Sequence, residues 1–207
     1  MIEIAPSLLS STNRIEDIKK LNNTDCKFIH IDVMDNKFVQ NYQMPVDEVI
    51  ELSKYSNKRF DVHLMVENPE EYINSLNINN IYNITFHIEI DKDINKLIDL
   101  VKKKGLSVGL AIKLDTPLNK LDEYLDKVDM ILIMSIAPGF GGQKFDERAI
   151  ERIKQIRKKK SDILIEVDGG INIDTIDKIK YFVDIAVAGS YITNSNDFGE
   201  AINNLKN

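Results

Sequence analysis

Two patterns of hydrophobic and polar residues alternate along the chain. Short runs rich in isoleucine and valine are typical of buried strands, and longer charged segments with an apolar residue every three or four positions are typical of amphipathic helices. The predicted strands are Glu3–Pro6, Phe28–Val33, Arg59–Met65, Asn83–His87, Ser107–Ile112, Met130–Met134, Ile163–Val167 and Ile185–Ala188. The predicted helices are Asn13–Leu21, Pro45–Tyr55, Pro69–Leu76, Asp93–Lys104, Leu118–Leu125, Asp146–Lys159, Ile173–Lys180 and Asp197–Leu205.

Local signals support several of these helix ends. Pro45 and Pro69 suit a first helical turn, where the missing N–H costs nothing. Gly105 follows a run of three lysines and suits a helix stop, because glycine readily takes the left-handed conformation found there. The alternation of strand and helix is therefore clear enough to predict a topology.

Eight strand–helix units follow one another within 207 residues. This alternation implies parallel strands joined by right-handed crossovers, and eight such units close into a barrel. We therefore expect an α/β protein in which residues 1–207 form a single (β/α)8 TIM-barrel domain. The alternative is an open doubly wound sheet, which usually carries a glycine-rich fingerprint after its first strand. Here the turn Pro6-Ser7-Leu8-Leu9-Ser10 contains no glycine.

Charge and composition narrow the choice of partners and compartment. The formal net charge is -6, and the one dense basic stretch, Arg157–Lys160, ends a predicted helix, where it favours the helix dipole. We expect no nucleic-acid partner, since binding needs a broad basic patch. Cys26 is the single cysteine, which excludes an internal disulfide and indicates a reducing, cytoplasmic setting.

Neither a targeting segment nor a membrane span is expected. The first residues lack a basic region followed by an apolar core, so they do not resemble a signal peptide. No apolar run approaches the roughly 20 residues that a membrane span needs. We therefore expect no membrane partner. Because no decisive apolar patch is evident, the oligomeric state stays open, a homo-oligomer included.

Ionisable residues gather at the predicted strand ends, where a barrel places its active site. His30 and Asp32 point to the same face, because side chains alternate along a strand. His63 and Asp168 end two further strands at a comparable height. Two imidazoles and two carboxylates suit one divalent metal ion, either Zn, Fe(II), Mn or Co. The alternative is four separate core polar groups, but buried polar groups need partners, and a shared metal supplies them most simply.

This residue set predicts metal-assisted proton transfer. A bound dication polarises a carbonyl and stabilises the enediolate that forms when a proton leaves the adjacent carbon. Asp32 and Asp168, from different strands, are placed to exchange a proton across the two faces of the enediolate, which inverts a stereocentre. Met34, Met65 and Met134 also end strands. They are predicted to line a water-poor pocket, although methionine is equally typical of gap-filling core.

Three glycine-containing loops are candidates for a phosphate site. Barrels often bind phosphate with the loops that follow strands seven and eight, where backbone N–H groups approach an anion closely. Six of the nine glycines lie in the loops after strands six, seven and eight. The loop residues are Gly139-Phe140-Gly141-Gly142, Gly169-Gly170 and Gly189-Ser190. The small loops favour a single phosphate over a dinucleotide.

Together these motifs resemble the ribulose-phosphate 3-epimerase family, in the same order and over nearly the whole chain. The strings H-I-D-V-M-D and P-G-F-G-G-Q-K-F are the most specific. The matching stretches are A-P-S-L-L-S (Ala5–Ser10), H-I-D-V-M-D (His30–Asp35), D-V-H-L-M-V (Asp61–Val66), M-S-I-A-P-G-F-G-G-Q-K-F (Met134–Phe145), E-V-D-G-G-I-N (Glu166–Asn172) and V-A-G-S (Val187–Ser190).

The resemblance implies an enzyme of the pentose phosphate pathway that interconverts D-ribulose 5-phosphate and D-xylulose 5-phosphate, a small phosphorylated ketose. It also implies that His30, Asp32, His63 and Asp168 hold a divalent metal and that Asp32 and Asp168 are the acid/base pair. Ser7 matches a substrate-contacting serine, and the three glycine loops match the family's phosphate and substrate loops. His63 and Asp168 are expected to contact the substrate as well.

A few positions depart from the family pattern. Asn36 and Gln40 stand where the family usually has glycine and proline, in a loop over the site. Asn tolerates positive φ, so Asn36 is expected to keep the turn, whereas losing the proline is expected to loosen the loop. Lys113-Leu114 replaces the family's Asn-Pro, and Tyr191 replaces a smaller residue. The metal set is intact.

Four other functions are alternatives to this one. An epimerase for a hexulose phosphate such as allulose 6-phosphate shares the chemistry and differs only in loop shape. A decarboxylase of the same barrel group would show Asp-x-Lys-x-x-Asp, but Asp32-Val33-Met34-Asp35 carries no lysine there. A Schiff-base aldolase would use Lys113. A catalytically silent barrel would bind a phosphosugar without reaction, and the intact set of histidines and aspartates argues against it.

Overall fold

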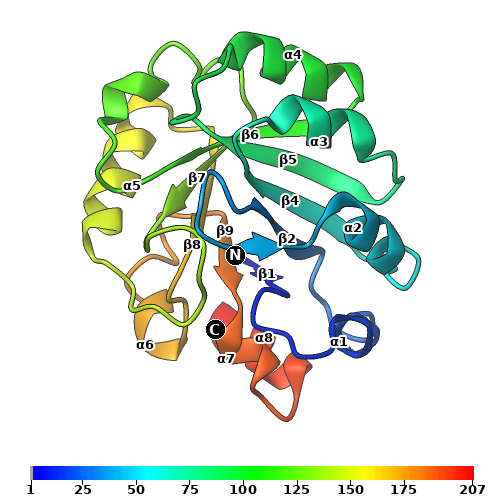
Figure 1. Ribbon diagram of the computed structural model, residues 1–207. Helices are drawn as coiled ribbons and strands as arrows, with labels where there is room; N and C mark the ends of the chain where they lie inside the picture. Colours follow the sequence, from blue (N-terminus) through cyan, green and yellow to red (C-terminus); the bar gives the residue numbers. More distant parts are fainter. Residues whose placement is uncertain (1) are drawn as a thin grey trace.

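The computed structural model describes residues 2–207. Within that range, eight parallel strands curl into a barrel wall, and a two-residue strand, β3, pairs antiparallel with the end of β2 (Figure 1). The order in the sheet is β1-β9-β8-β7-β6-β5-β4-β2-β3. The strands are β1 (Glu3–Pro6), β2 (Phe28–Asp35), β3 (Tyr42–Gln43), β4 (Arg59–Met65), β5 (Ile81–His87), β6 (Ser107–Ile112), β7 (Met130–Met134), β8 (Leu164–Asp168) and β9 (Ile185–Ala188).

The barrel closes between its first two strands, β1 and β2, where few backbone hydrogen bonds join the strands. Ser7 and His30 form a single parallel bridge, and the Leu8 N–H donates to the His30 carbonyl at 3.4 Å. On its other edge β1 pairs in full register with β9, from Glu3 opposite Ile185 onwards. The α/β barrel expected from the strand–helix alternation is confirmed.

Helices surround the strands as an outer ring (Figure 1). The last helix, α8, packs against the first strand, so the two ends of the chain meet on one side of the barrel. The helices are α1 (Arg14–Leu21), α2 (Val46–Ser53), α3 (Pro69–Ser75), α4 (Ile94–Lys103), the 3-10 helix η1 (Leu118–Leu121), α5 (Arg148–Lys159), α6 (Ile173–Ile176), α7 (Ser190–Thr193) and α8 (Phe198–Lys206).

The two faces of the barrel strands differ in chemistry. Residues facing the helices, such as Ile29, Ile31 and Val62, belong to one large hydrophobic core. Several residues at the alternating positions, facing the barrel interior, are polar and buried. They are His30, Asp32, Asp61, His63, Asn83, Thr85, His87 and Glu166. Because buried polar groups need partners, this interior is the first place to look for a site.

Several predicted element boundaries need correction. The segment Leu118–Leu125 begins as a short 3-10 helix and continues as turns, and Ile173–Lys180 is α-helical only as far as Ile176. Pro45 is the N-cap residue of α2 and lies before the first turn, whereas Pro69 is in the first turn of α3, as predicted. The elements β3 and α7 were not predicted.

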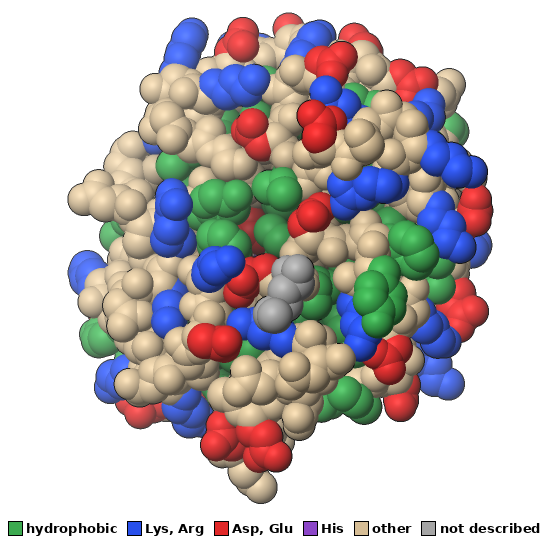
Figure 2. All heavy atoms as spheres, turned by 180° about the vertical axis from the view of Figure 1, so that it is seen from behind, with side chains coloured by type: hydrophobic (Ala, Val, Ile, Leu, Met, Phe, Trp, Pro, Cys, Tyr) green, Lys and Arg blue, Asp and Glu red, His purple; other side chains and the backbone are tan. Residues whose placement is uncertain are grey.

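Charges of both signs are mixed over the face drawn in Figure 2. Lysine and arginine side chains alternate there with aspartate and glutamate side chains, around hydrophobic side chains near the middle of the face. Within residues 2–207, no helix combines the length and the apolar character needed to cross a bilayer.

Candidate active site

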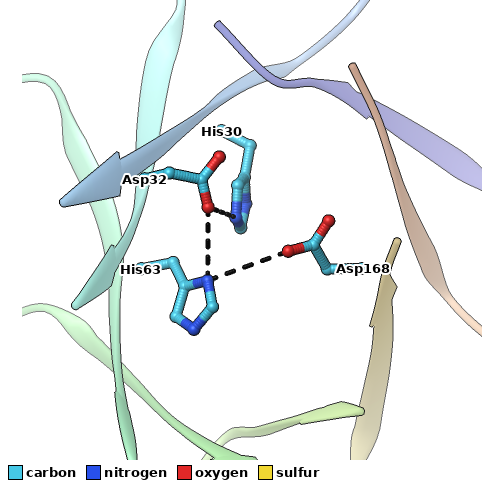
Figure 3. A group of neighbouring side chains, drawn as sticks. All are labelled: His30, Asp32, His63 and Asp168. Atoms are coloured by element: carbon cyan, nitrogen blue, oxygen red, sulfur yellow. Dashed lines mark ion pairs between the residues drawn. The ribbon is translucent and has the colours of Figure 1, made fainter. Parts of the chain in front are cut away.

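The four residues predicted as metal ligands come together at the C-terminal end of the barrel (Figure 3). His30 and Asp32 lie on β2, His63 on β4 and Asp168 at the end of β8. The strand register accounts for this, because Asp32 pairs directly with His63 across β2 and β4. One ligand atom from each of the four residues lies within 4.8 Å of the other three.

The atoms that face one another are arranged as metal ligands. Asp32 Oδ1 lies 3.4 Å from His30 Nε2 and 3.4 Å from His63 Nδ1, and Asp168 Oδ2 lies 3.9 Å from His63 Nδ1. Among residues 2–207, the first three atoms are buried without a hydrogen-bond partner. Three unpartnered buried atoms directed at one point fit a cation, which supplies the missing interaction for all of them.

Neighbouring groups fix the orientation of these ligands. The Ser7 hydroxyl donates to Asp32 Oδ2 at 2.7 Å, which turns Oδ1 towards the two histidines. His30 Nδ1 lies 2.7 Å from Asp61 Oδ2, so its Nε2 faces the cluster. His63 Nε2 lies 2.9 Å from His87 Nε2, so its Nδ1 faces the cluster. Such outer contacts commonly orient the ligands of metal sites.

The two aspartates have opposite pKa shifts. Burial favours a raised pKa for Asp32, but the two histidines outweigh it and hold this pKa below its usual range. Burial and the charge of Asp32 raise the pKa of Asp168 to about 6. Two carboxyl groups with separated pKa values can divide the roles of base and acid.

A second buried group lies deeper in the barrel, at His30, Asp61 and Glu166. His30 Nδ1 is already engaged with Asp61 and lies 3.7 Å from Glu166 Oε1. Burial alone would lower the pKa of His30, but Asp32 and Asp61 raise it well above its usual value. Burial, followed by the charge of Asp61, raises the pKa of Glu166. We interpret this group as support for His30, because it uses the nitrogen that faces away from the cluster.

A cavity of about 400 Å³ opens above the cluster. Asp32 and Asp168 lie on its wall, together with residues of the three glycine loops. The predicted site residues on its wall are Ser7, Asp32, Met65, Met134, Gly139, Phe140, Gly141, Gly142, Asp168, Gly169, Gly170, Gly189 and Ser190.

Three predicted residues do not line this cavity. His30 and His63 are fully buried beneath it and reach the site only through their ring nitrogens. Met34 was predicted to line the pocket, which is wrong: it packs in a small buried cluster with Val39 and Met65. Met34 follows Asp32 on the same strand face, but the loop after β2 folds back over it through Val39.

Gly169 and Gly170 are required by close packing as well as by backbone conformation. Their φ angles are 117° and 65°, in the region that side chains rarely adopt. A Cβ at Gly169 would lie 2.4 Å from a side-chain carbon of Ile136, and one at Gly170 would lie 2.4 Å from the backbone nitrogen of Phe145. The loop after β8 therefore packs so closely against the segment after β7 that neither glycine has room for a side chain.

Residues outside the predicted set also shape the cavity. Within residues 2–207, Lys144 is the one lysine or arginine on its wall. Asn172 lines the wall too, but its side chain caps the N-terminus of α6 by accepting from the Asp174 and Thr175 N–H groups. Both residues lie inside the quoted motifs, two positions after glycines that were predicted as site residues. Their position in the motif was a usable signal.

The loop after β2 keeps its turn despite its departures from the family pattern. Asn36 has a φ of 59°, as its tolerance of positive φ predicted. The Asn41 side-chain amide donates to the Gly139 carbonyl at 2.7 Å, which ties this loop to the loop after β7. Lys113 does not line the cavity, and its Nζ lies 4.1 Å from the centre of the Phe38 ring. That contact gives no support to a Schiff-base role.

Fold and site together define a (β/α)8-barrel enzyme with a histidine–aspartate cluster at the C-terminal strand ends. The model of the ribulose-phosphate 3 epimerase family matches residues 3–193. Ribulose-phosphate 3-epimerase of Bacillus subtilis is 35% identical over an alignment of 217 residues, gaps included. The alignment covers 100% of this chain and 99% of that protein. The cytoplasmic isoform of ribulose-phosphate 3-epimerase from Oryza sativa is 36% identical, covering 99% and 92%. The chain belongs to the ribulose-phosphate 3-epimerase family and is an isomerase of carbohydrates.

Solved structures with lower sequence identity share the barrel fold. The 3-hexulose-6-phosphate synthase of Salmonella typhimurium superimposes with a TM-score of 0.72 at 16% identity. The match covers 99% of this chain and 97% of that one. At this identity the likeness supports the fold alone.

Proposed function

We propose that this protein interconverts D-ribulose 5-phosphate and D-xylulose 5-phosphate, inverting C3 by proton transfer between two carboxyl groups, within the pentose phosphate pathway. The observation that carries the proposal is the pair Asp32 and Asp168. They reach one cavity from different strands, and their pKa values are shifted in opposite directions. Family membership supports the same activity.

The cluster residues would hold one divalent ion through His30 Nε2, Asp32 Oδ1, His63 Nδ1 and Asp168 Oδ2, which are the atoms that converge. Bound there, the ion supplies Lewis-acid polarisation of a carbonyl oxygen and stabilises the negative charge of an enediolate. The mixed imidazole and carboxylate set suits Zn, Fe(II), Mn or Co.

The two aspartates carry the proton. Asp32, which is ionised, removes the C3 proton from one face of the ketose. Asp168, whose pKa is raised to about 6 in the metal-free protein, returns a proton to the opposite face. In the reverse direction the two residues exchange roles. Ser7 holds Asp32 in place by donating to Oδ2.

The phosphate binds at the glycine-rich end of the cavity. Backbone N–H groups of Gly170, Gly189 and Ser190 donate to the phosphate oxygens there, because these residues line the cavity and the two glycines carry no side chain that would block the approach. Lys144 adds the positive charge. The length from this end to the two aspartates sets which carbon of the substrate lies between them.

Metal analysis and a coupled epimerase assay on the same sample test this proposal. We expect about one divalent ion per chain and turnover of the pentulose phosphate. Faster turnover of a hexulose phosphate would show the related hexulose epimerase activity instead. Binding of either sugar without turnover would show a silent barrel.

We also propose that residues 1–207 form one domain and that the protein works in the cytoplasm. The single sheet takes strands from both ends of the chain, which favours one folding unit. Cys26 is buried with a free thiol, and the rice relative is named as a cytoplasmic isoform. Limited proteolysis and cell fractionation test the two statements. A stable fragment would contradict the first, and recovery outside the cytoplasmic fraction the second.

A further inference from the structure

A chain of buried contacts extends behind His63, away from the cluster. His63 Nε2 lies 2.9 Å from His87 Nε2, and His87 Nδ1 lies 3.0 Å from Glu89 Oε2. The other oxygen of Glu89, Oε1, accepts from the Lys113 backbone N–H at 2.8 Å and from the Thr116 hydroxyl at 2.6 Å. Residues that the proposed reaction does not use therefore connect His63 to a carboxylate.

The hydrogen bonds in this chain have one direction. A backbone N–H can only donate, so Glu89 Oε1 is an acceptor. Burial alone would raise the pKa of Glu89, but hydrogen bonds from His87 and Thr116 lower it to about 2, so its second oxygen is an acceptor as well. His87 must then carry its proton on Nδ1, which leaves a lone pair on Nε2. His63 must donate to that lone pair from its own Nε2.

We propose that Glu89 and His87 are positioning residues that fix the tautomer of His63, with the proton on Nε2 and the lone pair of Nδ1 presented to the metal site. This inference rests on the proposed metal site. It requires no change of charge in these residues, only the direction of two hydrogen bonds, from His63 to His87 and from His87 to Glu89. A histidine ligand held this way binds a metal ion more strongly. The hydrogen bond from its other ring nitrogen to an acceptor raises the basicity of the nitrogen that faces the metal.

The arrangement behind His30 supports this interpretation independently. His30 Nδ1 contacts Asp61 directly at 2.7 Å, and its Nε2 faces the cluster. Each ligand histidine thus has a carboxylate behind it, Asp61 in one case and Glu89 in the other, with His87 as a spacer. His63 and His87 are fully buried, and the Phe38 ring covers His87 at 4.6 Å between ring centres. Water is therefore kept away from the hydrogen bonds that set the tautomer.

The first test needs no mutation. The chain contains three histidines, so ring-nitrogen NMR of the metal-free protein reports only six nitrogens. We expect Nε2 of His63 and Nδ1 of His87 to carry hydrogen, before and after Zn²⁺ is added. A bare Nε2 on His63, with hydrogen on Nδ1, would overturn the inference.

The second test reverses the direction of the hydrogen bonds between Glu89, His87 and His63 by a nearly isosteric substitution, Glu89→Gln. The Lys113 N–H and the Thr116 hydroxyl both require the amide oxygen, so the amide NH2 must face His87 Nδ1. His87 would then donate from Nε2, and the proton of His63 would move to Nδ1. We expect Zn²⁺ affinity to fall by about 10- to 100-fold, the usual effect of losing such an outer contact, and the NMR signals of His63 to show the other tautomer.

Thr116→Val is the matched control, because it removes one donor to the same carboxylate and leaves the charge in place. We expect it to bind Zn²⁺ within about twofold of the wild type, since Glu89 stays an acceptor for His87 and the direction of the hydrogen bonds to His63 is unchanged. Equal losses in Glu89→Gln and Thr116→Val would overturn the inference, as would an unchanged affinity in Glu89→Gln.

Failure of the proposed metal site gives a different result. In that case the wild-type protein itself would not bind Zn²⁺, while the NMR measurement would still report the tautomer of His63. If Glu89→Gln does not fold, the wild-type spectrum alone decides the proposal.

Discussion

The chemistry of the site depends on how differently its two aspartates are surrounded. Asp32 lies between two histidines and accepts from Ser7, so it is stabilised as an anion. Asp168 sits at the end of β8, where burial and the charge of Asp32 favour its protonated form. The same side chain thus supplies a base at one position and an acid at the other.

Asp168→Asn tests the second carboxyl group. An amide of the same shape cannot transfer the proton, so we expect kcat to fall by about 100- to 10,000-fold, the range for a lost general acid or base. The coupled assay measures this loss at saturating metal. Asp115→Asn is the control, because its side chain is exposed and pairs with Arg148 at the surface. Full activity in Asp168→Asn would rule out the two-carboxyl mechanism.

The stability of the metal-free protein should depend on pH through the same residue. The folded state raises the pKa of Asp168 from 3.8 to about 6 and so holds its proton more tightly than the unfolded state. This stabilisation is complete below pH 3.8 and is lost as the pH rises through about 6.

Urea unfolding in chelator at pH 4, 5, 6 and 7 measures the effect. We expect the free energy of unfolding of the wild type, relative to Asp168→Asn, to fall across this interval, because the amide cannot ionise. A difference between the two proteins that stays constant with pH would contradict the assignment.

At the residue scale the sequence predicted the cluster but missed what supports it. His30, Asp32, His63 and Asp168 were predictable because side chains alternate along strands and a barrel gathers its strand ends. The link from His63 to Glu89 was not, although His87 was recognised at a strand end. It depends on ring orientation and on contacts between adjacent strands, which no local pattern records.

The strands of the barrel wall were easier to predict than the helices around it. All eight barrel strands were located, because short runs rich in isoleucine and valine are typical of buried strands. The segment Leu118–Leu125 was predicted as a helix because leucines recur every three or four residues. The Leu121 carbonyl accepts from the Tyr124 N–H, three residues on, and from the Leu125 N–H, four residues on. An apolar pattern does not distinguish these 3-10 and α-helical types of hydrogen bond.

Asn36 offers a test of the loop after β2. Its φ of 59° costs most residues about 1–2 kcal/mol and glycine nothing. We expect Asn36→Ala to lower the free energy of unfolding by about 1 kcal/mol and Asn36→Gly to leave it unchanged or slightly raised, measured by urea unfolding. Asn57→Ala, at an exposed asparagine without positive φ, is the control and should have little effect. Equal losses in both alanine variants would contradict the strain argument.

For the whole molecule, metal binding should stabilise the fold. The ligands come from β2, β4 and β8, so an ion that bridges them binds the folded state alone. At a free concentration 100 times the Kd, this adds about 2.7 kcal/mol, which corresponds to a rise in Tm of about 5–10 °C for a chain of this size. Thermal unfolding with chelator and with added Zn²⁺ or Mn²⁺ measures the shift. An unchanged Tm with every divalent ion would contradict a metal site.

The narrow seam between β1 and β2 has a consequence for how the protein is made. Of the barrel strands, β1 leaves the ribosome before the others, but its full strand partner is β9, at Ile185–Ala188, which leaves after them. Until then, among residues 2–207, the bridge from Ser7 to His30 and the bond from the Leu8 N–H to the His30 carbonyl hold this part of the chain in the wall. Ser7 is the residue that turns Asp32 towards the cluster. The pairing of β1 in the wall is therefore completed only by β9, and a nascent chain that lacks β9 lacks the pairing that holds the strand next to Ser7.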